Sequence, residues 1–193
     1  MVPRKVIRGW RSRDTVPVHM ACSILLRGAL SGALLLPSAP SGADSRDKEP
    51  APRFHAVTTS GEKFTNESVK GKVVLLEFWT TWCPYCFADA PIVDKLGKEF
   101  EPKGMVLLAI NVGEGKKKVK KYLEEHPRTC RIVMMEDTNL AAMYQANVYP
   151  IYVVIDREGN ITATVRGSVR ERGLRRLLAD AGLPSDKDDD SDS

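Results

Sequence analysis

An almost unbroken apolar run, Val73 to Trp79, is separated by three residues from the pair Cys83 and Cys86. A run of this kind, in which Glu77 is the one polar residue, is typical of a strand buried on both faces of a sheet. Residues 84–100 predict a helix. The cysteine pair therefore stands where a buried strand ends and a helix begins, which points to an α/β architecture.

This junction favours a reactive thiol at Cys83. The first turn of a helix has unpaired N–H groups and about half a positive charge, and both favour a thiolate over a thiol. The thiolate is the nucleophile of disulfide exchange. Two cysteines separated by two residues can also close a small disulfide and reopen it, so Trp82-Cys83-Pro84-Tyr85-Cys86 predicts a redox couple rather than a structural crosslink.

Two other interpretations of the pair are weaker. A zinc site needs two further ligands, yet the remaining cysteines, Cys22 and Cys130, are isolated, and the three histidines have no ligand-like spacing. A structural disulfide usually closes a longer loop. We therefore predict no metal site, and we expect Cys130 to be a buried structural thiol.

Charge is divided unevenly along the 193 residues, which are enough for one domain with extensions. Residues 1–43 carry a net charge of +5 and the remainder a net charge of −1. Because the domain itself is nearly neutral, nothing in its charge indicates nucleic-acid binding. The lysines between 116 and 121 are expected to form the solvated face of a helix.

Residues 1–43 have the features of a signal peptide or N-terminal leader. A basic region precedes the mostly apolar stretch 24–36, and Ser41-Gly42-Ala43 resembles a small-x-small cleavage site. The stretch has 13 residues and includes Arg27, so it is shorter than the roughly 20 residues that span a membrane. Met20 is an alternative start. We expect the domain to work outside the cytoplasm, periplasmic or secreted, with an uncleaved leader as its one membrane link. A low-complexity leader is the alternative.

The remainder divides into a linker at 44–52, a domain at 53–183 and an acidic tail at 184–193 that we expect to be disordered. Alternating strands and helices imply a mixed sheet covered on both faces. The expected elements are a hairpin over 54–69 with Phe64 in the core, strands at 73–79, 105–112, 131–135, 151–156 and 161–165, and helices at 84–100, 116–125, 138–146 and 171–181. Pro91 predicts a kink in the first of these helices.

Taken together, the motifs resemble the thioredoxin superfamily, and within it the TlpA/ResA/CcmG-like extracytoplasmic thiol–disulfide oxidoreductases. The resemblance covers about residues 54–181 and is carried by Phe78 to Cys86, Asp89-x-Pro91, Asn111-Val112-Gly113-Glu114 and Tyr149-Pro150 before a strand. It implies a thioredoxin fold: a mixed central sheet flanked by helices, with an N-terminal hairpin and an inserted helix before a cis-proline.

The resemblance also implies roles for individual residues. Cys83 would be the attacking cysteine and Cys86 the resolving one. Pro150 would be the cis-proline that lies against the disulfide, Tyr149 would border the substrate groove, and Trp82 would cover the site.

Two acidic residues are candidates for tuning the thiols. Glu77 interrupts an apolar strand, where an unpaired ionised carboxylate would cost several kcal/mol, so a raised pKa is expected. Its position matches the buried acid of thioredoxin, which shuttles protons; a strand-end residue that reaches solvent is the alternative. Asp89 matches an acidic position that the family associates with thiol tuning, and the alternative is a first-turn acid that favours the helix dipole.

The resulting hypothesis is a thiol–disulfide oxidoreductase that acts on protein substrates as a reductase, with cytochrome c maturation among the pathways that the resemblance implies. We expect an upstream electron donor, a monomer and no cofactor. One alternative is a thiol peroxidase of the AhpC/TSA type, but its Pro-x-x-x-Thr-x-x-Cys pattern would need proline where Leu76 stands. Another alternative is a redox-inactive or metal-carrying binding module, for which the cysteine spacing is unsuitable.

Overall fold

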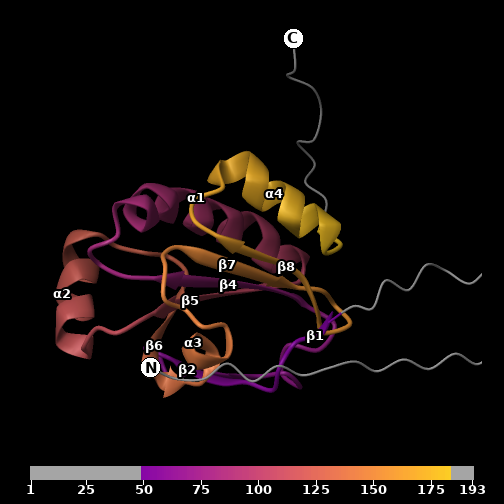
Figure 1. The fold of residues 1–193 in the computed structure, drawn as a ribbon, viewed down its shortest axis with the longest axis horizontal. Coiled ribbons are helices and arrows are strands. Elements are labelled where there is room, and N and C mark those ends of the chain that lie inside the picture. The colour runs from indigo at the N-terminus through magenta and orange to yellow at the C-terminus, as the bar shows by residue number, and fades with distance from the viewer. Residues whose placement is uncertain (1–48, 184–193) are drawn as a thin grey trace, which may run out of the picture. The chain divides into compact units, whose positions relative to one another are not determined.

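The computed structural model describes residues 49–183, and the predicted leader and acidic tail lie outside that range. An eight-stranded mixed sheet forms the centre of the described domain, in the order β1-β8-β7-β4-β5-β6-β2-β3 (Figure 1). The strands are β1 (Glu49–Pro50), β2 (His55–Thr58), β3 (Lys63–Thr65), β4 (Val73–Trp79), β5 (Met105–Asn111), β6 (Arg131–Thr138), β7 (Ile151–Ile155) and β8 (Asn160–Arg166). The helices are α1 (Pro84–Phe100), η1 (Glu101–Lys103), α2 (Lys116–Glu125), α3 (Leu140–Met143) and α4 (Arg170–Asp180).

The apolar run of β4 forms a central strand of the sheet. It pairs in parallel with β5 and antiparallel with β7, and every residue of these three strands is buried. Successive side chains of a strand point to opposite faces, so a run that is apolar at every position buries both faces. The expected two-sided burial of residues 73–79 is confirmed.

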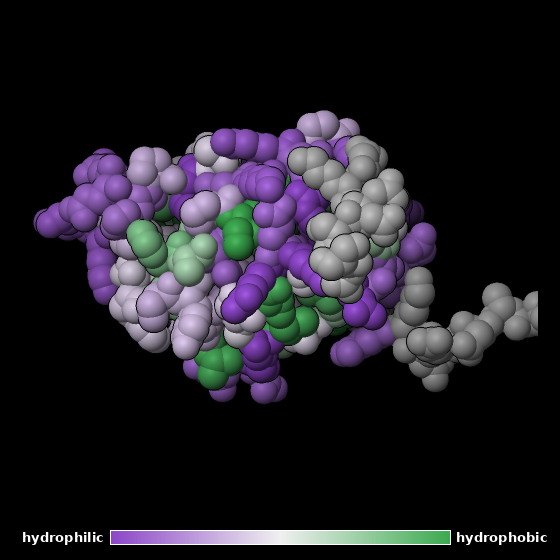
Figure 2. Space-filling view, turned by 90° about the horizontal axis from the view of Figure 1, so that it is seen from above, coloured by the Kyte–Doolittle hydropathy of each residue, from purple (hydrophilic) through white to green (hydrophobic). Residues whose placement is uncertain are grey.

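The two faces of the sheet are covered by different elements. On one face Val73 and Leu75 pack in a cluster with residues of α1 and α4. On the other face Leu76 and Phe78 pack in a cluster with residues of β2 and α3. Figure 1 shows α1 and α4 together on one side of the sheet and α3 on the other. The view from above shows small apolar patches separated by hydrophilic surface (Figure 2).

The thioredoxin-like α/β fold expected from the sequence is confirmed, with differences at its margins. β6 continues to Thr138, beyond the expected end at 135, and α3 has four residues rather than reaching 146. The side chain of Asn139 does not cap α3, because it accepts the N–H of His55 and donates to the carbonyl of Arg53. The side chain of Asn139 thus binds the segment that leads into β2 instead of the first turn of its own helix.

Two further details concern the N-terminal part of the described domain. Glu49–Pro50, inside the segment expected to be a linker, pairs antiparallel with β8. The ring of Phe64 is half-buried against the core, with the guanidinium of Arg131 over it at 5.7 Å. Among helices within residues 49–183, none combines the length and apolar character needed to cross a bilayer.

Candidate active site

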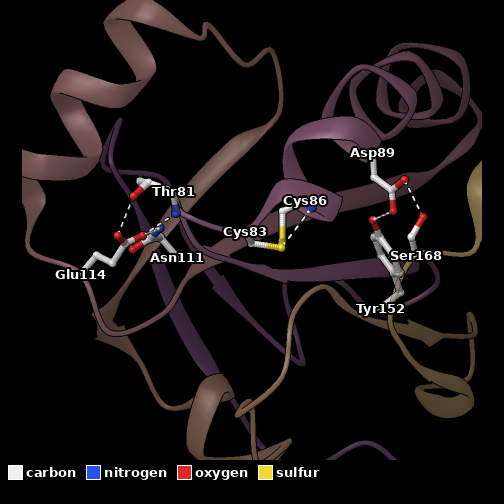
Figure 3. Close-up of a disulfide and its surroundings, with 8 residues drawn as sticks. All are labelled: Thr81, Cys83, Cys86, Asp89, Asn111, Glu114, Tyr152 and Ser168. Carbon is white, nitrogen blue, oxygen red and sulfur yellow. Dashed lines mark hydrogen bonds between the residues drawn. A yellow bond between two sulfur atoms is a disulfide. The ribbon is translucent and has the colours of Figure 1, made fainter.

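Cys83 and Cys86 are joined by a disulfide at the beginning of α1 (Figure 3). Cys83 is the N-cap residue with extended backbone, and Pro84 occupies the first turn, where its missing N–H costs no hydrogen bond. The backbone N–H of Cys86 donates to Cys83 Sγ at 3.0 Å. Cys83 is 4% exposed and Cys86 is 2% exposed, so the difference in burial is too small to assign the attacking cysteine.

The loop before Cys83 is fixed by Glu114, whose side chain is 4% exposed. Its carboxylate accepts the N–H and the hydroxyl of Thr81, both at 2.6 Å, and the side-chain amide of Asn111 at 2.9 Å (Figure 3). Lys118 Nζ lies 2.6 Å from the same carboxylate. Burial alone would raise the pKa of Glu114, but the hydrogen bonds from Lys118, Thr81 and Asn111 lower it to about 2. The carboxylate is therefore ionised and holds the loop at neutral pH.

Aromatic side chains lie beside the disulfide, in two segments that carry no charge. Trp82 and Tyr85 are each 65% exposed, and the ring of Trp82 meets that of Tyr149 edge-on at 5.8 Å. Tyr149 packs against the apolar cluster that includes both disulfide cysteines. The Tyr149–Pro150 peptide bond is cis, as the resemblance predicts. Neither segment 78–88 nor segment 139–155 contains an acidic or basic residue.

Glu77 is fully buried in β4, so the alternative of a solvent-reaching carboxylate is wrong. Its carboxylate has a charged partner, because Arg128 Nη2 donates to Glu77 Oε2 at 2.8 Å. The second oxygen, Oε1, is buried and has no hydrogen-bond partner among the described residues 49–183. Burial raises the pKa of Glu77, and the arginine offsets this only in part.

Asp89 is 3% exposed and accepts two hydroxyl hydrogen bonds, from Tyr152 at 2.9 Å and from Ser168 at 2.8 Å (Figure 3). It therefore ties α1 to β7 and to the segment before α4. A surface carboxylate that merely complements the helix dipole does not fit this burial. Tyr152 pairs directly with Glu77 across β4 and β7, so the two acidic residues flank one tyrosine.

Sequence reasoning missed Arg128, Tyr152 and Ser168 as parts of the site. Arg128 and Ser168 lie in connecting segments, where a charged or polar residue is ordinarily solvated, and nothing in their spacing indicates a buried partner. Tyr152 lies within an apolar strand and has the pattern of a core residue. One signal could have indicated the cation: Glu77 is the one acid in the apolar run of β4, and a buried carboxylate is stable only with a partner such as a cation.

Cys130 is a free, half-buried thiol, and burial raises its pKa. It packs against the same apolar cluster as the disulfide cysteines and shares no disulfide with them. In residues 49–183, no group of three or more histidine, cysteine or acidic side chains has the arrangement of a metal site.

A thioredoxin-like fold with a two-cysteine disulfide at the start of α1 and a cis-proline before β7 defines the chain as a thiol–disulfide oxidoreductase. Sequence comparison agrees: the chain belongs to the AhpC/TSA family, whose sequence profile matches residues 48–164.

The chain is also similar to individual proteins of this class. The chain is 31% identical over 121 residues to the thiol-disulfide oxidoreductase ResA of Bacillus subtilis, covering 63% of this chain and 68% of ResA. It is 30% identical over 136 residues to the thioredoxin-like protein YneN of the same organism, covering 69% and 79% of the two chains. A solved thiol:disulfide interchange protein of the thioredoxin family from Chlorobium tepidum superposes with a TM-score of 0.61 at 28% identity, covering 72% of this chain and 99% of that one.

Proposed function

We propose that the chain reduces disulfide bonds in other proteins, with Cys83 as the attacking and Cys86 as the resolving cysteine. The observation that carries this proposal is the position of the disulfide at the N-cap of α1, where the Cys86 N–H donates to Cys83 Sγ. A thiolate at Cys83 would accept the same hydrogen bond more strongly and would lie at the positive end of the helix dipole.

The proposed reaction consists of two exchanges. The Cys83 thiolate attacks one sulfur of the substrate disulfide, an enzyme–substrate disulfide forms, and the other substrate sulfur leaves as a thiolate that takes up a proton. Cys86 then loses its proton, attacks Cys83 Sγ and releases the second substrate thiolate, which is protonated in turn. Two electrons pass from enzyme to substrate, and an upstream thiol donor must reduce the enzyme again.

Glu77 is the proposed acceptor of the Cys86 proton. Its complete burial and its raised pKa support this role, because a carboxylate works best as a proton acceptor when its pKa approaches the working pH. Asp89 is proposed to tune the thiols by fixing the first turns of α1, through its bonds to Tyr152 and Ser168.

The substrate is proposed to bind across Trp82, Tyr149 and Pro150. The exposure of Trp82, its contact with Tyr149 and the lack of charge in both segments favour a polypeptide with uncharged residues around its cysteine. We propose cytochrome c maturation as one pathway in which this activity is used. The basic and apolar leader supports an extracytoplasmic location, and we propose that the domain acts as a monomer.

Cysteine variants test the roles of the two sulfurs. Cys86→Ser should accumulate a mixed disulfide with a substrate protein, because the second exchange cannot occur, whereas Cys83→Ser should accumulate none. Cys130→Ser is the matched control and should turn over like the unaltered protein. Trapping by Cys83→Ser but not by Cys86→Ser would reverse the assignment. A reduction potential measured against glutathione then distinguishes a reductase from an oxidant.

A peroxidase is the second candidate, since the AhpC/TSA family profile matches the chain. Leu76 stands at the position of the peroxidatic proline and is fully buried within β4, paired with β5 and β7. Consumption of hydrogen peroxide by the reduced protein, at a rate comparable to its disulfide reduction, would favour this candidate instead.

A further inference from the structure

A buried cluster of three charged side chains joins β4, α1 and the segment before β6. Arg128, in the segment between α2 and β6, donates through Nη2 to Glu77 of β4 at 2.8 Å and through Nε to Asp94 of α1 at 2.9 Å. The three side chains are 5%, 0% and 12% exposed in the order Arg128, Glu77, Asp94. One cation therefore binds two carboxylates. These carboxylates belong to β4, which precedes the cysteine pair, and to α1, which begins at it.

The two carboxylates differ in how many of their oxygens accept a hydrogen bond. Asp94 uses both oxygens, because Oδ1 accepts from Arg128 and Oδ2 accepts the backbone N–H of Thr129 at 2.8 Å. Within the part of the chain that the structure describes, Glu77 accepts a hydrogen bond only at Oε2, and its buried Oε1 has no partner. A fully ionised cluster would hold a net negative charge in the interior, which is costly. Since Asp94 is the better stabilised anion, the proton that neutralises the cluster belongs on Glu77.

Other groups near Glu77 act in the same direction or are already engaged. Asp89 on α1 adds negative charge, but its carboxylate accepts hydrogen bonds from Tyr152 and Ser168. Three further titratable groups interact with Glu77 and are uncharged near neutral pH: Tyr152 of β7, Tyr122 of α2 and Cys130 before β6. Arg128 is the cation that donates a hydrogen bond to Glu77 and lowers its pKa against the effect of burial.

We propose that Arg128 and Asp94 together set the protonation of Glu77, with Asp94 withdrawing part of the charge of Arg128 so that Glu77 stays able to exchange a proton. Both are positioning residues for the proton acceptor. This inference rests on the proposed role of Glu77. The inference assigns the segment between α2 and β6 a role in thiol chemistry, although this segment is far from the cysteine pair in the sequence.

The test uses two substitutions with opposite expected effects. Asp94→Asn keeps the shape of the side chain but releases the arginine to Glu77, so Glu77 should titrate lower by roughly 1 pH unit. Arg128→Met removes the cation, so Glu77 should titrate higher by a similar amount. The control is Lys95→Met, the next residue on α1, whose ammonium is half-exposed and pairs with Glu171 on α4.

Two readouts separate this inference from the proposed function. The carbon-13 shift of the Glu77 carboxyl reports its titration in the oxidised protein, without any turnover. The pH profile of disulfide reduction reports its use. Opposite shifts in Asp94→Asn and Arg128→Met, with none in Lys95→Met, support the proposal. Shifts in the same direction, or none in Asp94→Asn, would overturn it.

Two further outcomes are informative. Arg128→Met leaves two buried carboxylates and can fail to fold; Asp94→Asn then decides alone, since it removes one buried charge and its amide oxygen can still accept one of the two hydrogen bonds, from Arg128 or from Thr129. An unchanged pH–rate profile in Glu77→Gln, combined with opposite titration shifts in the two variants, would remove the proton-acceptor role from the proposed function and leave the charge-sharing cluster intact.

Discussion

At the scale of single residues, Glu77 is expected to make the stability of the protein depend on pH. Burial raises its pKa above the ordinary value of 4.5, so the folded protein holds this proton more tightly than the unfolded chain does. The contribution to stability is complete below that value and is lost as the pH rises through the folded-state pKa. A buried carboxyl thus favours the fold most when it is protonated.

Glu77→Gln should therefore lose less stability than the unaltered protein between about pH 4 and about pH 8. Glutamine does not titrate, and its carbonyl can still accept the hydrogen bond of Arg128. Urea unfolding of both oxidised proteins at the two pH values measures the difference, and the exposed Glu67→Gln serves as control. Equal pH dependence in Glu77→Gln and the unaltered protein would contradict this expectation.

Glu114 is expected to have the opposite dependence on pH. Its pKa is lowered from 4.5 to about 2, so its stabilising contribution is complete above about pH 4.5 and disappears as the pH falls toward 2. Glu114→Ala should cost roughly 1–3 kcal/mol at neutral pH, because Thr81 and Asn111 lose a charged acceptor. The difference from the unaltered protein should shrink in acid, as measured by denaturant unfolding. Lys118→Met removes only the exposed partner and should cost less.

At the scale of elements, α1 lies unusually close to β5. A Cβ added at Gly97 would lie 2.9 Å from Cδ2 of Leu107, which is fully buried in the core. Alanine is the better helix former by about 1 kcal/mol, yet overpacking a core costs roughly 1–3 kcal/mol. Crowding should win, so Gly97→Ala is expected to destabilise the domain by about 1 kcal/mol.

Thermal unfolding of a double variant distinguishes crowding from a propensity effect. Leu107→Ala removes the side chain that the new methyl group would meet, so Gly97→Ala should become neutral or stabilising in that background. An equal loss of melting temperature in both backgrounds would show that contact with Leu107 is not the cause.

The sequence predicts elements well where one local pattern dominates. The bounds of β4 and α1 agree with expectation, because an all-apolar run and a helix start at Pro84 leave few alternatives. The cysteine pair followed from its own spacing, whereas the cis-proline followed from the family resemblance. The partners of the buried acids did not: Arg128 lies 51 residues from Glu77, and Ser168 lies 79 residues from Asp89. Such contacts depend on how the sheet brings distant segments together, and no periodicity records them.

At the scale of the whole molecule, positive charge is concentrated before the domain. Residues 1–43 carry a net +5, whereas the remainder carries a net −1. A basic region followed by an apolar stretch and small residues is the order found in secretory signals. This division supports the proposal that the oxidoreductase domain is delivered across a membrane and works where disulfides persist.

The proposed cleavage pattern can be tested by two neighbouring substitutions. Small residues are required at the positions occupied by Ser41 and Ala43, whereas the residue between them is variable. Ala43→Tyr should therefore block processing and leave the leader attached, while Gly42→Tyr should be processed normally. N-terminal sequencing of the exported protein should give a chain that begins near Asp44 in Gly42→Tyr and an unprocessed chain in Ala43→Tyr. Recovery of full-length protein from the cytoplasmic fraction in both variants and in the unaltered protein would contradict export.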